Sequence, residues 1–174
     1  MTTKARVVVQ DAKYAIEAHT GTLQAEHFRI SWIALVTLLR AVGHVLKKVD
    51  CSESAARKAA IEQKWKELSI TKPEPAIFWG FIELERNRFL KNYEHGIRRE
   101  VTVLGPAFKG TETTISIDVG NRGGGGGGLV SGLQSTISSG PFAGQSERAI
   151  AWQAYDWWVS YLDEIDAITA GNDA

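Results

Sequence analysis

The sequence predicts a mainly α-helical bundle of about five helices, with a small β-hairpin and a glycine-rich loop inserted before the last helix. Two observations support this. Apolar residues recur at helical spacing on both sides of the middle of the chain, whereas residues 98–142 alternate apolar with polar residues and are rich in glycine. Because 174 residues suit one domain, we treat residues 1–174 as a single helical domain with an insertion at about 98–142.

Four helices are expected before the insertion. The first is short and closes at Gly21, and the second is the strongest because most of its positions are apolar. The third starts at a capping box formed by Asp50 and Glu53, and the fourth follows two prolines and ends at Gly96. The expected ranges are 12–19, 25–49, 50–68 and 76–94.

The insertion is expected to form a hairpin from "EVTVL" and "TTISIDV", whose apolar residues alternate. Residues 129–137 could add one more short strand. The run "GNRGGGGGG" satisfies a phosphate-loop pattern only trivially, and no Lys-Ser or Lys-Thr follows it. We therefore interpret it as a flexible surface connection and expect no bound nucleotide or other cofactor.

The last helix, at about 146–167, has two apolar stripes instead of one. One stripe can face the protein's own core. The second needs a cover, which could be the hairpin or a second subunit. The first stripe contains Trp152, Tyr155, Val159 and Leu162, and the second contains Ile150, Ala154, Trp157 and Tyr161.

The charge distribution is uneven, although the net charge is zero and the pI is near 6.9. Residues 1–110 hold 18 Lys/Arg and 12 Asp/Glu, a net charge of +6, while residues 111–174 hold 2 and 8, a net charge of −6. This asymmetry could steer an acidic ligand to the first part, or let the acidic last helix dock on basic helices.

A cytoplasmic location without membrane association is expected. The lone Cys51 cannot form an internal disulfide, and residues 1–10 lack the apolar core of a signal peptide. The most apolar stretch, "ISWIALVTLL", is shorter than the roughly 20 residues that a membrane span needs.

Few residues carry recognisable chemistry. The four histidines are scattered without metal-ligand spacing, so no metal site is expected, and no nucleophile motif is present. Arg40 and His44 lie four residues apart on the polar stripe of the second helix. They could bind an anion, or they could simply be solvated.

Arg86 is unusual because it lies within the apolar arc of the fourth helix, the face expected to be buried. The arc is formed by Phe78, Trp79, Ile82, Phe89, Leu90 and Tyr93. A buried guanidinium needs a partner. We expect either an ion pair with an acid of the last helix (Asp156, Asp163 or Asp166) or an arginine held toward an open groove.

The segment "RNRFLKNY" resembles the motif of the HEPN superfamily, in which Arg and a polar residue are followed by three variable residues and His. Arg86, Asn87 and Tyr93 match in register, and Lys91 takes the histidine's place. The resemblance covers about 10–95 and 146–167. Many members are dimeric, metal-independent ribonucleases, often prokaryotic toxins or defence proteins, and this implies a homodimer with catalytic positions at Arg86, Asn87 and Lys91.

Lysine has an ordinary pKa near about 10.4, so Lys91 makes a poor general base, and catalysis is expected to be weak or absent. The leading expectation is a variant HEPN-like protein that binds RNA or a partner protein in prokaryotic or phage defence. The alternatives are an active metal-independent endoribonuclease that uses Arg86 or Arg88 with His95, and a structural dimer that binds an unrelated protein. We expect an exposed strip of basic residues that could bind phosphate, along one face of the fourth helix and the residues just after it. The strip consists of Arg88, Lys91, His95, Arg98 and Arg99.

Overall fold

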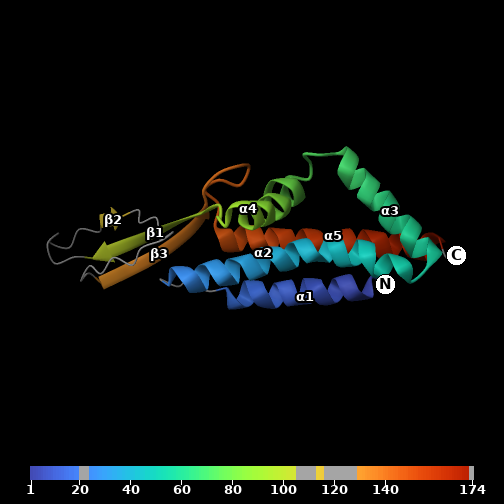
Figure 1. Cartoon of the computed structure of the whole chain (residues 1–174), viewed down its shortest axis with the longest axis horizontal. Coiled ribbons are helices and arrows are strands. Elements are labelled where there is room, and N and C mark those ends of the chain that lie inside the picture. Colours follow the sequence, from blue (N-terminus) through green and yellow to red (C-terminus); the bar gives the residue numbers. More distant parts are fainter. Residues whose placement is uncertain (20–23, 105–112, 116–128, 173–174) are drawn as a thin grey trace.

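A computed structural model describes residues 1–19, 24–104, 113–115 and 129–172. It confirms the mainly helical class and shows a helical bundle with a small antiparallel sheet (Figure 1). The elements in chain order are α1 (Thr3–Ala18), α2 (Ala25–Lys48), the 3₁₀ turn η1 (Asp50–Ser52), α3 (Ala55–Ile70), the π-helix η2 (Ile77–Glu83), α4 (Leu84–Asn92), β1 (Ile97–Leu104), β2 (Thr113–Ile115), β3 (Leu129–Ile137) and α5 (Glu147–Asn172).

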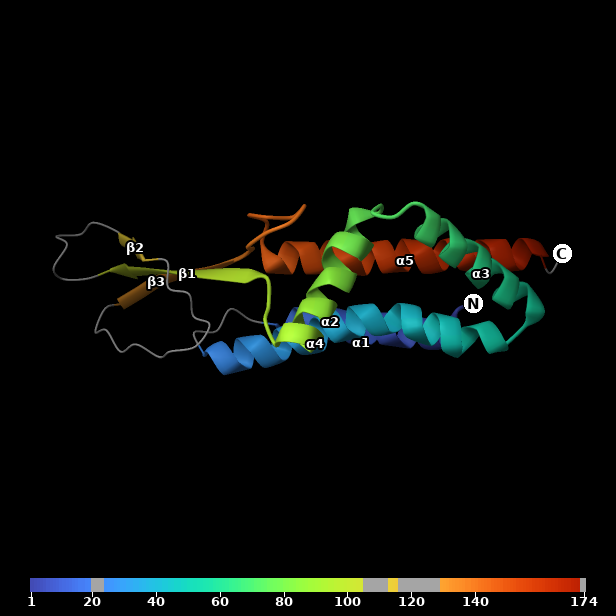
Figure 2. The same ribbon diagram turned by 45° about the horizontal axis from the view of Figure 1, so that its top comes forward.

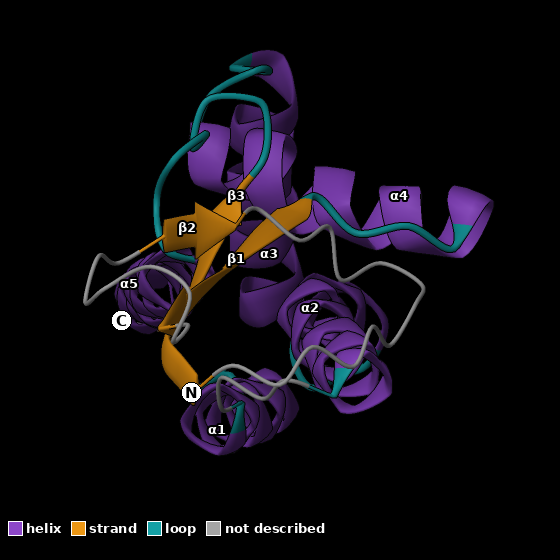
Figure 3. Cartoon of the chain, turned by 90° about the vertical axis from the view of Figure 1, so that its left-hand side faces the viewer, coloured by secondary structure: helices purple, strands orange, loops and turns teal. Residues whose placement is uncertain are grey.

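Three long helices, α1, α2 and α5, lie lengthwise beside one another, and α3 crosses the end where both termini lie (Figures 1 and 2). The sheet extends from the opposite end of the bundle, and Figure 3 shows α1, α2 and α5 end-on behind it. The sheet and α3 are therefore placed at opposite ends of the molecule.

Helix α2 is the centre of the bundle. Together with η1 it is long and apolar enough, by length and composition, to cross a membrane, so its apolar stretch is longer than "ISWIALVTLL" alone suggests. In the bundle its apolar side chains pack against the other helices, as the helical spacing predicted. Its buried residues are Phe28, Trp32, Leu35, Val36, Leu39, Val42, Gly43 and Leu46.

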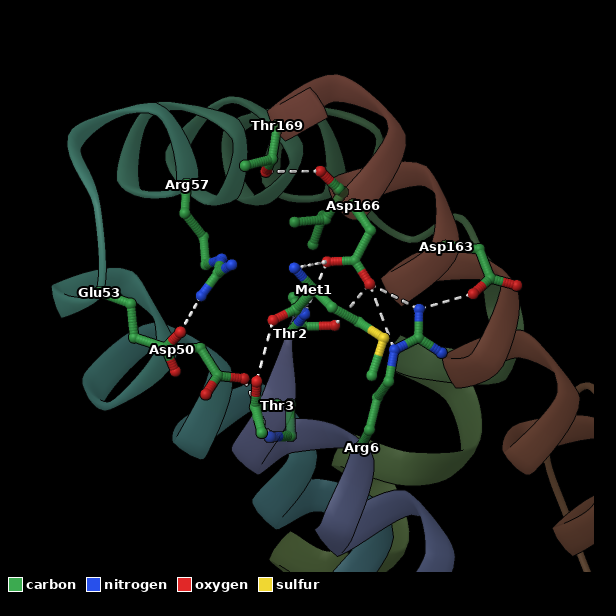
Figure 4. Close-up of polar contacts among 12 residues, drawn as sticks. Met1, Thr2, Thr3, Arg6, Asp50, Glu53, Arg57, Asp163, Asp166 and Thr169 are labelled. Atoms are coloured by element: carbon green, nitrogen blue, oxygen red, sulfur yellow. Dashed lines mark hydrogen bonds and ion pairs between the residues drawn. The ribbon is translucent and has the colours of Figure 1, made fainter. Parts of the chain in front are cut away.

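Helix α1 begins at Thr3, earlier than the sequence predicted, because two distant carboxylates hold its first turn (Figure 4). Asp50 is fully buried and accepts hydrogen bonds from the backbone N–H groups of Lys4 and Ala5 at 3.0 and 2.9 Å. Asp166 accepts from the backbone N–H of Thr2 at 2.6 Å. These bonds replace the side-chain cap that Thr2 itself does not provide.

The predicted capping box of α3 is wrong in its residues. Ser54 is the N-cap, and its Oγ accepts from the backbone N–H of Arg57 at 3.1 Å. Glu53 instead pairs with the Arg57 guanidinium, and Asp50 caps α1 (Figure 4). A capping residue satisfies whichever N–H groups lie nearest in space, and for Asp50 these belong to another helix.

The sheet has the strand order β2-β1-β3 and is antiparallel throughout. The predicted hairpin corresponds to β1 and β2, with Val101 opposite Ile115, and the third strand at 129–137 is confirmed. Among the sheet residues whose burial is described, Ile97 and Ile137, which face each other at the base of the sheet, belong to the core. Residues 116–119 and the glycine run lie outside the described residues, so the predictions about them stay predictions.

Helix α5 buries more than one stripe. Ile150, Ala154 and Tyr161 of the second predicted stripe are buried, whereas Trp157 is half-buried against Phe78 with ring centroids 5.4 Å apart. Within the described part of the chain, the first stripe splits: Leu162 is buried, and its other members, Trp152, Tyr155 and Val159, are half-buried against the core. Neighbouring helices thus cover much of both stripes, and the homodimer stays a prediction.

Candidate functional site

The fourth helix begins with the π-helix η2 and continues as α4, and its buried face lies on a different arc from the predicted one. At about 100° per residue, the arc centred on Phe78 and Phe89 runs toward Phe81 instead of toward Leu90. The buried side chains are Phe78, Phe81, Ile82, Glu85 and Phe89, while Leu90 and Tyr93, which were predicted to be buried, are 59% and 67% exposed. The buried charge is therefore Glu85 and not Arg86.

Arg86 is half-buried and makes no ion pair with α5. Its Nη1 donates to Asn87 Oδ1 at 2.8 Å, and the Asn87 amide donates to Glu83 Oε1 at 3.2 Å. The prediction of an ion pair to the last helix is wrong, because Arg6 of α1 pairs with both Asp163 and Asp166 (Figure 4).

Glu85 is 3% exposed and gathers three donors. Its carboxylate accepts from Arg88 Nη1 at 2.7 Å, from the backbone N–H of Gly96 at 3.0 Å and from Trp32 Nε1 at 3.4 Å. A Cβ at position 96 would clash with Arg88 and Glu85, so this close approach requires glycine. The Arg88 guanidinium is thus neutralised inside the protein, with its other nitrogen 3.4 Å from Ser139 Oγ.

His95 lies outside the helix, which ends at Asn92 with Tyr93 in the left-handed region at φ 56°. Its ring packs edge-on against Phe28 at 5.7 Å, and its Nδ1 accepts from the backbone N–H of Ile97. Arg88 and His95 therefore do not share a helix face, and the predicted pairing of these two residues as a second active motif has lost its geometric basis.

The predicted phosphate-binding strip is also divided by the strand. Successive side chains of a strand point to opposite faces, so Arg98 is exposed while Arg99 is 2% exposed. The Arg99 guanidinium lies 4.3 Å from the centroid of the Phe28 ring. Arg40 pairs with Glu83, and His44 is exposed.

Arg99 belongs to a buried polar cluster that joins the sheet to the bundle, and sequence reasoning missed this cluster. The cluster contains His19 of α1, Ser31 of α2, Arg99 of β1 and Glu147 of α5. These residues come from four elements, so no local spacing could have indicated them.

His19 is neutral in this cluster. Burial lowers the pKa of His19 to about 4, and the charges of Arg148 and Arg99 lower it as well. Ser31 Oγ donates its proton to the Phe28 carbonyl at 3.0 Å and lies 2.7 Å from His19 Nδ1. In the tautomer that satisfies both contacts, the Nδ1–H group of His19 donates a hydrogen bond to Ser31 Oγ. Ser31 is therefore not activated as a nucleophile, even though Glu147 lies 3.9 Å from His19 Nε2. The cluster anchors the base of the sheet.

Several cations without a carboxylate partner lie on α4, on the first turns of α2 and on β1, although such cations, for example Lys66 of α3, also occur elsewhere. In the described chain, Arg29, Arg86, Lys91 and Arg98 make no ion pair with a carboxylate, unlike Arg40 and Arg88. The Arg29 guanidinium lies 5.7 Å from the centroid of the exposed Tyr93 ring. We call Arg29, Arg86, Lys91, Tyr93 and Arg98 the α4-end surface. Among the described residues, no group of three His, Cys, Asp or Glu is placed to hold a metal ion.

Comparison with known proteins gave no relative. No family model matches the chain, and neither a curated protein nor a solved structure matches it.

Proposed function

We propose that this chain is a HEPN-like protein that binds RNA at the α4-end surface and cleaves it weakly or not at all. One observation carries the proposal. The region has one strongly exposed aromatic ring, Tyr93, together with cations that no described carboxylate neutralises. Exposed rings stack on unpaired bases, and free cations bind the phosphates between them.

The same geometry argues against efficient catalysis. Ribonuclease chemistry needs a group that exchanges a proton near neutral pH, placed beside a cation that stabilises the transition state. Arg88 is neutralised by Glu85, and the His95 ring packs on Phe28. Lys91, which stands in the place of the motif's histidine, is exposed to solvent.

The test measures binding of a fluorescein-labelled oligouridine by anisotropy, in EDTA and at low salt. Tyr93→Ala should weaken binding by about 1 to 3 kcal/mol, as loss of one stacking ring does. Lys91→Ala and Arg98→Ala should each lower the salt slope by about 0.7. Glu94→Gln, which removes an exposed acid beside Tyr93, should tighten binding.

The matched control is Lys66→Ala, which removes an exposed cation of α3. It should leave binding unchanged. Absence of any anisotropy change at low salt, or equal weakening by Lys66→Ala, would refute the proposal. Cleavage of the oligonucleotide in EDTA that His95→Ala abolishes would establish the active ribonuclease instead.

The homodimer and the prokaryotic defence setting follow from the family resemblance alone. Sedimentation tests the dimer directly, because a monomer at all concentrations would exclude a composite site.

A further inference from the structure

A pocket of about 270 Å³ is lined by residues of the second half of α3 and the middle of α5. It is separate from the α4-end surface. One wall is aromatic: the rings of Trp157 and Tyr161 stack with centroids 5.1 Å apart and planes at 29°. Stacked rings of this kind offer negative faces to a cation.

The pocket already holds an ammonium group, which comes from the chain itself. Lys64 Nζ lies 3.0 Å from Glu67 Oε2, 2.7 Å from Glu164 Oε2 and 5.7 Å from the centroid of the Tyr161 ring. The Lys64 side chain is 18% exposed, whereas the two glutamates are 49% and 58% exposed. Two carboxylates around one ammonium leave the site with a net negative charge.

The hydroxyl of Tyr161 is a second, independent sign of a ligand. Tyr161 lines the pocket and is 6% exposed, and its Oη has no hydrogen-bond partner among the described residues. Burial, together with the charges of Glu67 and Glu164, raises the pKa of Tyr161, so the phenol is neutral at physiological pH. A buried hydroxyl without a partner is uncommon, because it has lost its hydrogen bonds to water and has gained none within the protein.

We propose that this pocket binds the primary ammonium group of a small aliphatic amine, which takes the place of Lys64 Nζ. The ligand's N–H groups would donate to Glu67, Glu164 and the Tyr161 hydroxyl, and its alkyl chain would lie on the Trp157 ring. The volume of the pocket is small compared with most ligand-binding sites, and this suits a short amine. Lys64 is then an internal competitor that must move aside.

The experiment titrates the protein with butylamine by calorimetry and follows the tryptophan indole signals by NMR. Lys64→Ala should bind butylamine about tenfold more tightly than the unmodified protein, because the internal competitor is gone. Glu164→Gln should weaken binding about tenfold by removing one carboxylate. Tyr161→Phe keeps the aromatic ring and the fold but loses the hydroxyl, and it should weaken binding several-fold.

Two controls test whether the ammonium group and this site are responsible. Glu62→Gln makes the same charge change on α3 at a side chain that is 66% exposed and pairs with Lys58, and it should leave binding unchanged. Butanol, which has the alkyl chain without the charge, should not bind.

Three outcomes would overturn the proposal. These are no saturable binding by the Lys64→Ala protein, equal weakening by Glu62→Gln and Glu164→Gln, or equal binding of butanol and butylamine. Binding of a lysine-containing peptide but not of butylamine would also overturn it, because the ammonium would then come from a protein side chain.

Discussion

The ion pair between Glu85 and Arg88 decides whether Arg88 can act on a ligand. The contribution of this pair to the free energy of unfolding is therefore the quantity to measure first. Glu85→Ala should lower the free energy of unfolding by about 3 kcal/mol. It leaves the buried N–H of Gly96 and the indole N–H of Trp32 without their acceptor, at about 1 to 3 kcal/mol each. The hydrogen bond from Trp32 Nε1 to Glu85 is long at 3.4 Å, so its loss should cost an amount near the low end of this range. Arg88 can turn toward solvent and adds little.

A double-mutant cycle isolates the ion pair. Glu85→Gln, Arg88→Met and the double variant should give a coupling of about 1.5 kcal/mol by urea unfolding, followed by circular dichroism. This exceeds the roughly 0.2 to 0.5 kcal/mol of an exposed helix pair, because the Glu85 side chain is only 4% exposed. The exposed pair of Lys58 and Glu62 provides the control cycle, with an expected coupling below about 0.5 kcal/mol.

If the two cycles gave equal coupling, Arg88 would not be held by Glu85. Arg88 would then be free to act on a ligand, and the active ribonuclease would regain support.

Three further predictions concern stability. Asp50→Ala should lower the free energy of unfolding by about 2 kcal/mol, because two backbone N–H groups of α1 lose their acceptor. Asp50→Asn should cost about half of that, since Asn keeps one acceptor oxygen. As the control, Asp156→Ala at an exposed position should change the free energy of unfolding by less than about 0.5 kcal/mol. The free energy of unfolding should fall by up to about 3 kcal/mol as the pH drops from about 6.5 to about 4. In this range unfolded His19 binds a proton that the folded form, with its pKa of about 4, does not bind, and the raised pKa of Glu147 partly opposes the resulting loss. His19→Gln should flatten this pH profile, and an unchanged profile would show that other groups cause the acid loss. Tyr161→Phe should raise the free energy of unfolding by about 1 kcal/mol by removing a buried hydroxyl without a partner, and a clear loss of stability would show that the hydroxyl is satisfied.

Much of the fold could be predicted because its signals are local. Apolar spacing placed α2 within one residue of its observed end and found α5. The alternation in "EVTVL" and "TTISIDV" located most of β1 and the described β2, and the strand expected at 129–137 matches β3. A side-chain period reports which face of an element is buried, and it does so without knowledge of the partner.

The candidate site could not be predicted in the same way. The prediction for Arg86 placed Leu90 and Tyr93 on the buried face of the fourth helix, but both are exposed. An arc that contains Phe81 and Ile82 fits the same helical step and places Glu85 on the buried face. Only the packing of the helix decides between the two arcs.

By itself, the sequence determined the helical class, the dominant core helix and the place of the inserted sheet, because each depends on the pattern of neighbouring residues. Only the tertiary structure decided which charges are buried and with what partners. Asp50 caps α1 across the bundle, Arg6 takes the acids that Arg86 was expected to bind, and Arg99 lies over Phe28. A charge is stabilised by whatever donors and rings surround it in space, and these come from elements far apart in the chain.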